Sequence, residues 1–363
     1  MSSTSLAGSL GTAARLIAFA TAYGLLAVTS MELRDSAALS TLYWPPAGLL
    51  LAALILAPTR RWPGWMALAA SLHVAAGVVV AQRSLSIAVV FAAADLVLCG
   101  AVAALWRRAA GSARDLAHPA RALWFIGLTG VASIVTGRLL VALLDVLQPG
   151  VRTDCWYVWS LAAFAGCAVV TPLVLAWAGL QLRQLGEQNL RHLWLGLLAG
   201  FALLAGTTWV FNSSHAIAGH VWPAHGWPGH DWLVHSWPWM HLPRDQNLVA
   251  GQWQLDLIDP LYAPLIFLAL LALNWGPPGT TLAVAGLALL CGSYTYSGLG
   301  PYADAGARSI PPLLALQIYL ACAAVIGIVL ASVRRKRVAV HGDAIDTAEG
   351  EGEDMHAGDD GKP

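Results

Sequence analysis

Apolar stretches of roughly 20 residues, long enough to cross a bilayer, recur along nearly the whole chain. Hydrophobic residues make up 58% of the 363 residues and charged residues only 11%. No polar stretch before the C-terminal tail is long enough to fold independently as a catalytic or signalling domain. The pattern therefore predicts an all-α, polytopic integral membrane protein whose first partner is the lipid bilayer.

Hydropathy windows predict about ten transmembrane helices. They lie near residues 12–31, 39–58, 62–81, 85–106, 122–147, 157–180, 193–211, 260–275, 278–297 and 311–333. The eighth and ninth flank residues 274–279, Asn-Trp-Gly-Pro-Pro-Gly, whose glycine and proline content predicts a tight turn. Either of these two segments could instead be tilted, kinked or re-entrant.

The distribution of basic residues predicts the orientation. With both termini cytoplasmic, the loops on the outer side contain only five Arg residues, and the inner side contains twelve basic residues. Those twelve are Arg60, Arg61, Arg107, Arg108, Arg114, Arg121, Arg183, Arg191, Arg334, Arg335, Lys336 and Arg337. We therefore expect an N-in/C-in membrane domain over residues 1–337, whose Arg residues meet anionic lipid and not nucleic acid. Residues 338–363 are acidic and Gly-rich, which predicts a disordered cytoplasmic tail.

Two motifs predict helix starts. In Trp44-Pro45-Pro46-Ala47-Gly48 the prolines suit the first turn of a helix, where backbone N–H groups lack intrahelical partners. The amphipathic ring of Trp44 suits the lipid headgroup level. A second motif, Trp-Pro-Gly at residues 62–64, opens the third predicted span after Arg60 and Arg61.

Further motifs follow in order: Trp156 and Trp159 before Gly166, then Thr-Pro-Leu at 171–173, Pro260 to Gly276, and Gly298 to Tyr302 before Leu316-Gln317. Together these motifs resemble the type-1 membrane-associated sensor (MASE) domain family, over most of residues 40–337. The resemblance implies a multi-span sensory input module of the bacterial cytoplasmic (inner) membrane.

In such proteins the module usually precedes a histidine-kinase domain or a domain that makes or degrades cyclic-di-GMP. After Arg337 we find no ATP-binding glycines, phospho-acceptor helix or GGDEF-like stretch. We therefore expect a non-enzymatic module without its own output domain that acts through such a histidine kinase or cyclic-di-GMP enzyme. A homo-oligomer is a further alternative.

Ionisable residues inside predicted spans are candidates for a ligand or signal site, because a charge there is costly and is usually paired or faces water. Arg138 could pair with Asp145 two turns away or with Asp95, and His73 is a neutral candidate. The alternative is a polar clamp between helices. The candidate site residues are Trp44, Asp95, Arg138, Asp145, Trp156 and Trp159. For the two last tryptophans, aromatic anchoring at the external interface is the competing interpretation.

A degenerate pentapeptide repeat places six histidines in a predicted external loop over residues 212–259. They are His215, His220, His225, His230, His235 and His241. One hypothesis is capture of a transition metal ion by neutral imidazoles. Three prolines exclude a continuous helix over the repeat, so a four-ligand site requires the loop to fold back. The alternative is a locally expanded repeat whose Trp rings lie in the interface.

Two other classes of function compete with sensing. The intramembrane charges and the His-rich loop also fit a multi-span transporter or metal-handling permease, although the two halves of the chain show no clear duplication. A membrane-embedded enzyme is disfavoured, because neither an HExxH motif nor a Gly-x-Ser-x-Gly elbow is present.

Overall fold

The computed structural model describes residues 3–32, 34–35, 40–110, 116, 118–147, 156–178, 190–221, 263–297, 299–300, 302 and 313–334. Within these ranges the regular secondary structure is helical apart from one short antiparallel ribbon, in which Arg34–Asp35 (β1) pairs with Ser40–Thr41 (β2). The predicted all-helical membrane class is therefore confirmed. The loop beyond Val221 and the acidic tail lie outside the described residues.

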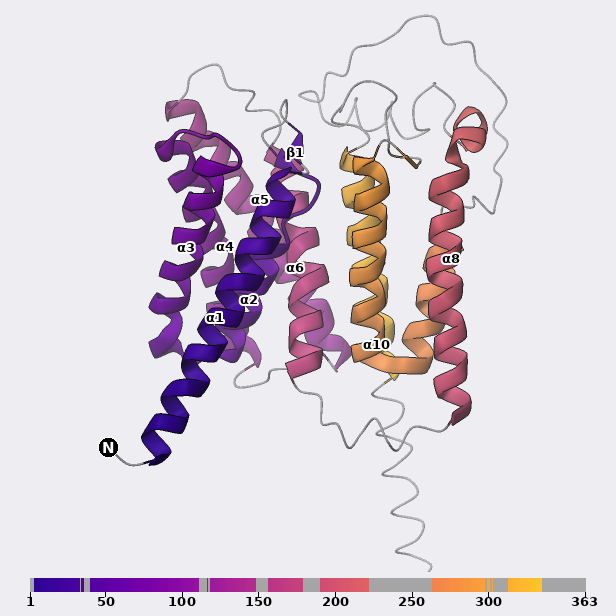
Figure 1. The fold of residues 1–363 in the computed structure, drawn as a ribbon, viewed down its shortest axis with the longest axis horizontal. Coiled ribbons are helices and arrows are strands. Elements are labelled where there is room, and N and C mark those ends of the chain that lie inside the picture. Colours follow the sequence, from indigo (N-terminus) through magenta and orange to yellow (C-terminus); the bar gives the residue numbers. More distant parts are fainter. Residues whose placement is uncertain are drawn as a thin grey trace, which may run out of the picture.

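The helices lie side by side, as Figure 1 shows. In chain order they are α1 (Ser3–Glu32), α2 (Pro45–Leu56), the 3₁₀ turn η1 (Thr59–Arg61), α3 (Trp62–Val79), α4 (Leu85–Ala110), α5 (Pro119–Leu147), α6 (Trp156–Ala178), α8 (Leu190–Val221), α10 (Ala263–Tyr296) and a last helix, Leu313–Arg334. Among the described residues, eight helices are long and apolar enough to cross a membrane.

Proline fixes several of the helix starts. Pro45 and Pro46 form the first turn of α2, Pro63 is in the first turn of α3, and α5 begins at Pro119. Each position lacks an intrahelical acceptor for its N–H, so the ring costs no hydrogen bond there. The helix starts predicted at Pro45 and Trp62 are confirmed.

The number of long helices differs from the predicted ten for two reasons. The second predicted span, residues 39–58, is helical only over the 12 residues of α2. The eighth and ninth spans form one element, α10, whose helical course is interrupted at Gly276 with φ 64° and ψ −160°. At this kink the chain reverses direction at the bottom of the view in Figure 1. The turn predicted at residues 274–279 is therefore confirmed, as the interior of α10.

Two apolar cores share α6. One core is formed by residues of the helices from α1 through α6. The other is formed by α6, α8, α10 and the last helix, together with Leu42 and Tyr43. On α6, Trp159, Ala162 and Cys167 belong to the first core, and Val158, Ala165 and Val169 to the second. α6 is accordingly the most buried of the eight long helices, with 61% of its apolar window buried, whereas α3 is only 17% buried and presents most of its apolar surface outward.

Candidate functional site

Helix α2 begins inside the bundle and not at its surface. The N–H of Trp44 donates to the carbonyl of Ala162 at 2.9 Å, six residues into α6. The Trp44 side chain contacts His73, six residues before the end of α3, and Asp95, ten residues into α4. At about 1.5 Å per residue, these partners place Trp44 about 9–15 Å below the neighbouring helix ends. α2 is therefore a half-length helix that starts inside the bundle, below the ends of its neighbouring helices.

Two glycines make this position accessible to the backbone. A Cβ at Gly166 would overlap the carbonyl of Trp44, and a Cβ at Gly48 would overlap the carbonyl of Gly166. The hydroxyl of Thr171 adds a hydrogen bond of 2.9 Å to the carbonyl of Gly48. α2 thus contacts the backbone of α6 directly, because neither glycine has a side chain to separate them.

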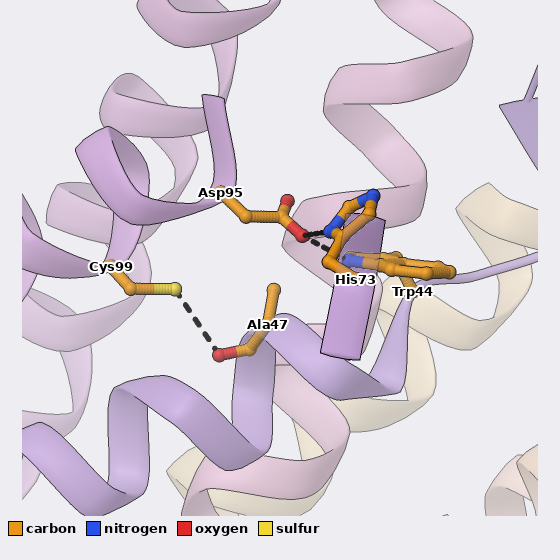
Figure 2. A network of polar contacts seen from close by, with 5 residues as sticks. All are labelled: Trp44, Ala47, His73, Asp95 and Cys99. Carbon is orange, nitrogen blue, oxygen red and sulfur yellow. Dashed lines mark hydrogen bonds and ion pairs between the residues drawn. The ribbon is translucent and has the colours of Figure 1, made fainter. Parts of the chain in front are cut away.

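Trp44, His73 and Asp95 form the polar centre of this region, which we call the Asp95 cluster (Figure 2). The indole Nε1–H of Trp44 donates to Oδ2 of Asp95 at 2.5 Å. Nδ1 of His73 lies 2.9 Å from the same oxygen, and the Trp44 and His73 rings are 4.9 Å apart. Asp95 is only 1% exposed and His73 3% exposed, so the carboxylate is stabilised by protein groups instead of bulk water.

The two contacts of Asp95 differ in quality. The Trp44 bond meets hydrogen-bond geometry, whereas Nδ1 of His73 is within ion-pair distance without a hydrogen-bond direction. We therefore treat the His73 contact as proximity of an imidazole and a carboxylate. The second carboxylate oxygen, Oδ1, is buried and has no hydrogen-bond partner among the described residues. The cluster thus retains acceptor capacity that the protein groups around it do not use.

The cluster adjoins the first turn of α2. Cys99, one helical turn after Asp95, donates its thiol to the carbonyl of Ala47 at 3.3 Å (Figure 2). The positive end of a helix dipole favours nearby negative charge, so this end of α2 suits the Asp95 carboxylate. On α1, the buried phenol of Tyr23 interacts electrostatically with Asp95.

The carboxyl end of α2 is also fixed by neighbouring side chains. Arg107 of α4 donates to the carbonyls of Leu54 and Ala57, and its guanidinium lies 5.2 Å from the ring of Trp62. The indole N–H of Trp62 donates to the carbonyl of Leu54 at 2.8 Å. A cation and an indole thus supply donors to carbonyls that have no intrahelical partner.

The segment just before α2 contacts the last helix. The buried side chain of Gln317 donates from Nε2 to the carbonyl of Thr41 at 3.0 Å. Together with the bonds from α6, this contact means that residues 41–48 are held by both apolar cores. Motifs that are far apart in the sequence, at 44–48, 166–171 and 316–317, therefore meet at one place.

A small cavity lies beside the Asp95 cluster. It measures about 20 Å³ and is lined by Trp44 and His73 together with Thr41, Arg83, Phe91 and Trp159. Space of that size holds about one water molecule. Arg83 lies in the α3–α4 connection, where its guanidinium is 4.1 Å from the ring of Phe91. The cavity therefore extends from the buried cluster toward a loop.

The structure brings together only part of the predicted site. Trp44 and Asp95 are in contact, and Trp159 lines the same cavity. Arg138, for which Asp145 and Asp95 were the two expected partners, lies over the ring of Trp156 at 4.0 Å, and Asp95 contacts Trp44 and His73. Asp145 is exposed on α5.

The ring of Trp44, expected at the lipid headgroup level, lies inside the bundle instead, whereas interfacial anchoring of Trp156 and Trp159 stays a prediction. Trp44 is 5% exposed, Trp156 8% and Trp159 9%. The reason for Trp44 is its indole N–H, which has a buried carboxylate as partner. His73, a neutral candidate at the sequence level, is the group that the structure adds to the site. A signal for it was available: His73 is one of very few ionisable residues in the predicted spans.

The metal hypothesis is untested by the described residues. α8 continues to Val221, so the backbone at His215 and His220 is helical, and Pro223 is the first proline after it. The side chains of these two residues, and the positions of His225, His230, His235 and His241, lie outside what the structure describes. Among the described residues, no group of three or more His, Cys, Asp or Glu side chains could hold a metal ion.

Eight apolar helices of membrane-crossing length among the described residues, with the shorter α2 beginning between them beside a buried carboxylate, define a multi-pass helical membrane protein. The sequence model of the MASE1 family matches residues 15–337, nearly the whole chain, and the chain belongs to this family of membrane-associated sensor domains. Comparison with curated proteins gives no match, and neither does comparison with solved structures.

Proposed function

We propose that this chain is a sensory input module of the bacterial inner membrane in which the Asp95 cluster is the site that responds to the stimulus. The observation that carries the proposal is the buried carboxylate and imidazole at the start of a half-length helix. A charge at that depth is costly and is usually tied to function. Membership of a membrane-associated sensor family supports the sensory role.

The contacts around residues 41–48 suggest how a response leaves the site. A change at Trp44 alters the geometry of its N–H bond to Ala162 and hence the packing of α2 on α6. It also alters the position of Thr41, whose carbonyl accepts the Gln317 bond from the last helix. The output of the Asp95 cluster is therefore a displacement of the last helix relative to α6.

We further propose the N-in/C-in topology, with ten passes when α2 and the two limbs of α10 are counted separately. The bond from Arg107 to the carboxyl end of α2 brings two basic clusters, 60–61 and 107–108, to the same end of the bundle. Arg334 ends the last helix. This distribution supports a cytoplasmic position for that end.

The partner in this proposal is a histidine kinase or a cyclic-di-GMP enzyme, and the chain itself performs no catalysis. The test is crosslinking of the tagged full chain in native membranes, followed by mass spectrometry of its neighbours. Asp95→Asn removes the buried charge, and Asp145→Asn removes an exposed charge on α5 as the matched control. We expect a signalling enzyme to be recovered, with a yield that changes in Asp95→Asn and not in Asp145→Asn.

A second candidate is a multi-span transporter or metal-handling permease. The observation that favours it is α2 itself, because half-length helices that begin at membrane depth beside a charge also form substrate sites in transporters. Two results together would favour transport over sensing as the function. They are substrate or metal flux in proteoliposomes that Asp95→Asn abolishes, and no signalling enzyme in a crosslinking reaction shown to work.

A further inference from the structure

From the geometry of the Asp95 cluster we infer that its ligand is a proton. This inference rests on the proposed function for its biological role, but the binding step can be measured separately. It concerns three groups: the Asp95 carboxylate, the His73 imidazole and the Trp44 indole.

The size of the site restricts the ligand. The cavity beside the cluster measures about 20 Å³, so it holds about one water molecule and no organic ligand in this conformation. The donor set also argues against a metal ion, because the described residues provide no group of three or more His, Cys, Asp or Glu side chains. One carboxylate with an imidazole nitrogen 2.9 Å from one of its oxygens is sufficient to bind a proton.

An acceptor is present, and a cavity reaches its neighbours Trp44 and His73. Oδ1 of Asp95 is buried and has no hydrogen-bond partner among the described residues, so it can receive a proton without losing a contact seen there. The cavity adjoins His73 and extends to the half-buried Arg83 in the α3–α4 connection. A water molecule in this space can carry a proton between the loop and the cluster.

The other titratable groups around Asp95 come from several elements. Tyr23 on α1 interacts with the carboxylate, Cys99 is one turn away on α4, and Cys167 of α6 adjoins Cys99. Arg83 lines the cavity, and α2 contains no ionisable residue. On α5, the ionisable side chains Arg121, Arg138 and Asp145 are exposed. His73 is thus the side chain best placed to share a proton with Asp95.

The binding step changes both charge and hydrogen bonding. A hydronium ion transfers one proton to Oδ1 of Asp95: one O–H bond of the hydronium breaks, one O–H bond forms on the carboxylate, and a water molecule remains. The charge of the pair rises by one. When Asp95 takes the proton, the bond from Trp44 changes from a charge-assisted bond to a neutral one, which is about half as strong. Proton binding therefore loosens the start of α2.

The test follows Trp44 directly in the full-length protein. The chain is labelled with 5-fluorotryptophan and reconstituted in nanodiscs, and its ¹⁹F spectrum is recorded across a pH series. Trp44→Phe identifies the Trp44 resonance among those of the 17 tryptophans. We expect this resonance to move in one titration step in the unaltered protein. The step is lost in Asp95→Asn, and its midpoint shifts by about one pH unit in His73→Gln.

Asp145→Asn is the matched control and leaves the titration of Trp44 unchanged, because Asp145 is exposed on another helix. Asn retains an acceptor oxygen for the Trp44 indole. If Asp95→Asn nevertheless fails to fold, infrared difference spectra of the unaltered protein with ¹³C-labelled aspartate report the same proton. A carboxylic acid band that appears with the Trp44 step supports the proposal, and its absence overturns it.

Two results separate this inference from the proposed function. A Trp44 resonance that does not titrate, or titrates equally in Asp95→Asn, refutes proton binding, even if Asp95→Asn still changes the crosslink to a signalling enzyme. A Trp44 resonance that titrates through Asp95 establishes proton binding, even when no signalling enzyme is recovered in the crosslinking experiment.

Discussion

Replacing Gly166 by Ala tests the direct backbone contact between α2 and α6. A Cβ there would overlap the carbonyl of Trp44, and even the third-nearest atom, the backbone nitrogen of Pro45, would lie 2.9 Å away. Carbon contacts are favourable only at about 3.5–4.0 Å, so the two helices must separate. Overpacking of this kind costs about 1–3 kcal/mol.

Separation of the helices also breaks two hydrogen bonds of 2.9 Å, from Trp44 to Ala162 and from Thr171 to the carbonyl of Gly48. Each contributes about 1 kcal/mol. Ala returns about 1 kcal/mol through its higher helix propensity. We therefore expect Gly166→Ala to lower the free energy of unfolding by about 2–4 kcal/mol, the combined result of these terms.

The assay is reversible unfolding of the purified protein in bicelles. Gly127→Ala on α5 is the matched control, because a Cβ at that helical position meets nothing within 4 Å and only the propensity gain remains. Equal stability of the Gly166 and Gly127 variants would refute the reasoning and show that α2 can move away from α6 without loss.

Three other substitutions test single contacts in the same unfolding assay. Arg107→Ala removes the donors at the carboxyl end of α2 and should lower the free energy of unfolding by about 2 kcal/mol. Arg108→Ala, at the adjacent exposed residue, should be nearly neutral, and equal effects would contradict the role of Arg107 in capping α2. Gly276→Ala forces a side chain into a glycine conformation and should cost about 1–3 kcal/mol, unlike Gly286→Ala, where a Cβ meets nothing within 4 Å. Gln317→Met keeps the volume but removes the donor to the carbonyl of Thr41, and the loss of this hydrogen bond should cost about 1 kcal/mol. An unchanged stability would show that this bond does not contribute.

Local chemistry in the sequence predicted where helices begin and where one of them is interrupted. Pro45 and Pro63 start helices, and the Gly276 turn interrupts one, because each depends only on the backbone of that residue and its immediate neighbours. The motif at residues 44–48, part of the family resemblance, indicated that this segment is important. It did not show that Gly48 faces Gly166, since this requires knowledge of which helices are neighbours.

Depth in the membrane could not be predicted from hydropathy. Trp44 precedes an apolar run, which is typical of an interfacial ring, but its indole is buried against Asp95. An apolar window measures the transfer of a segment into lipid and carries no information about where a short helix begins. The contact of Arg138 with the face of Trp156 from the next helix could not be predicted for a similar reason, because spacing along one helix carries no information about neighbouring helices.

The hydrogen bond between Thr171 and Gly48 has a consequence for biosynthesis, because it joins positions 123 residues apart. When α2 leaves the ribosome, the helix that covers its glycine face has not yet been made. α2 has only 12 residues, about 18 Å, and is too short to cross the hydrocarbon layer alone. During synthesis it must therefore wait beside α1, α3 and α4 until α6 is inserted, so the order of membrane insertion and the order of final packing differ in this chain.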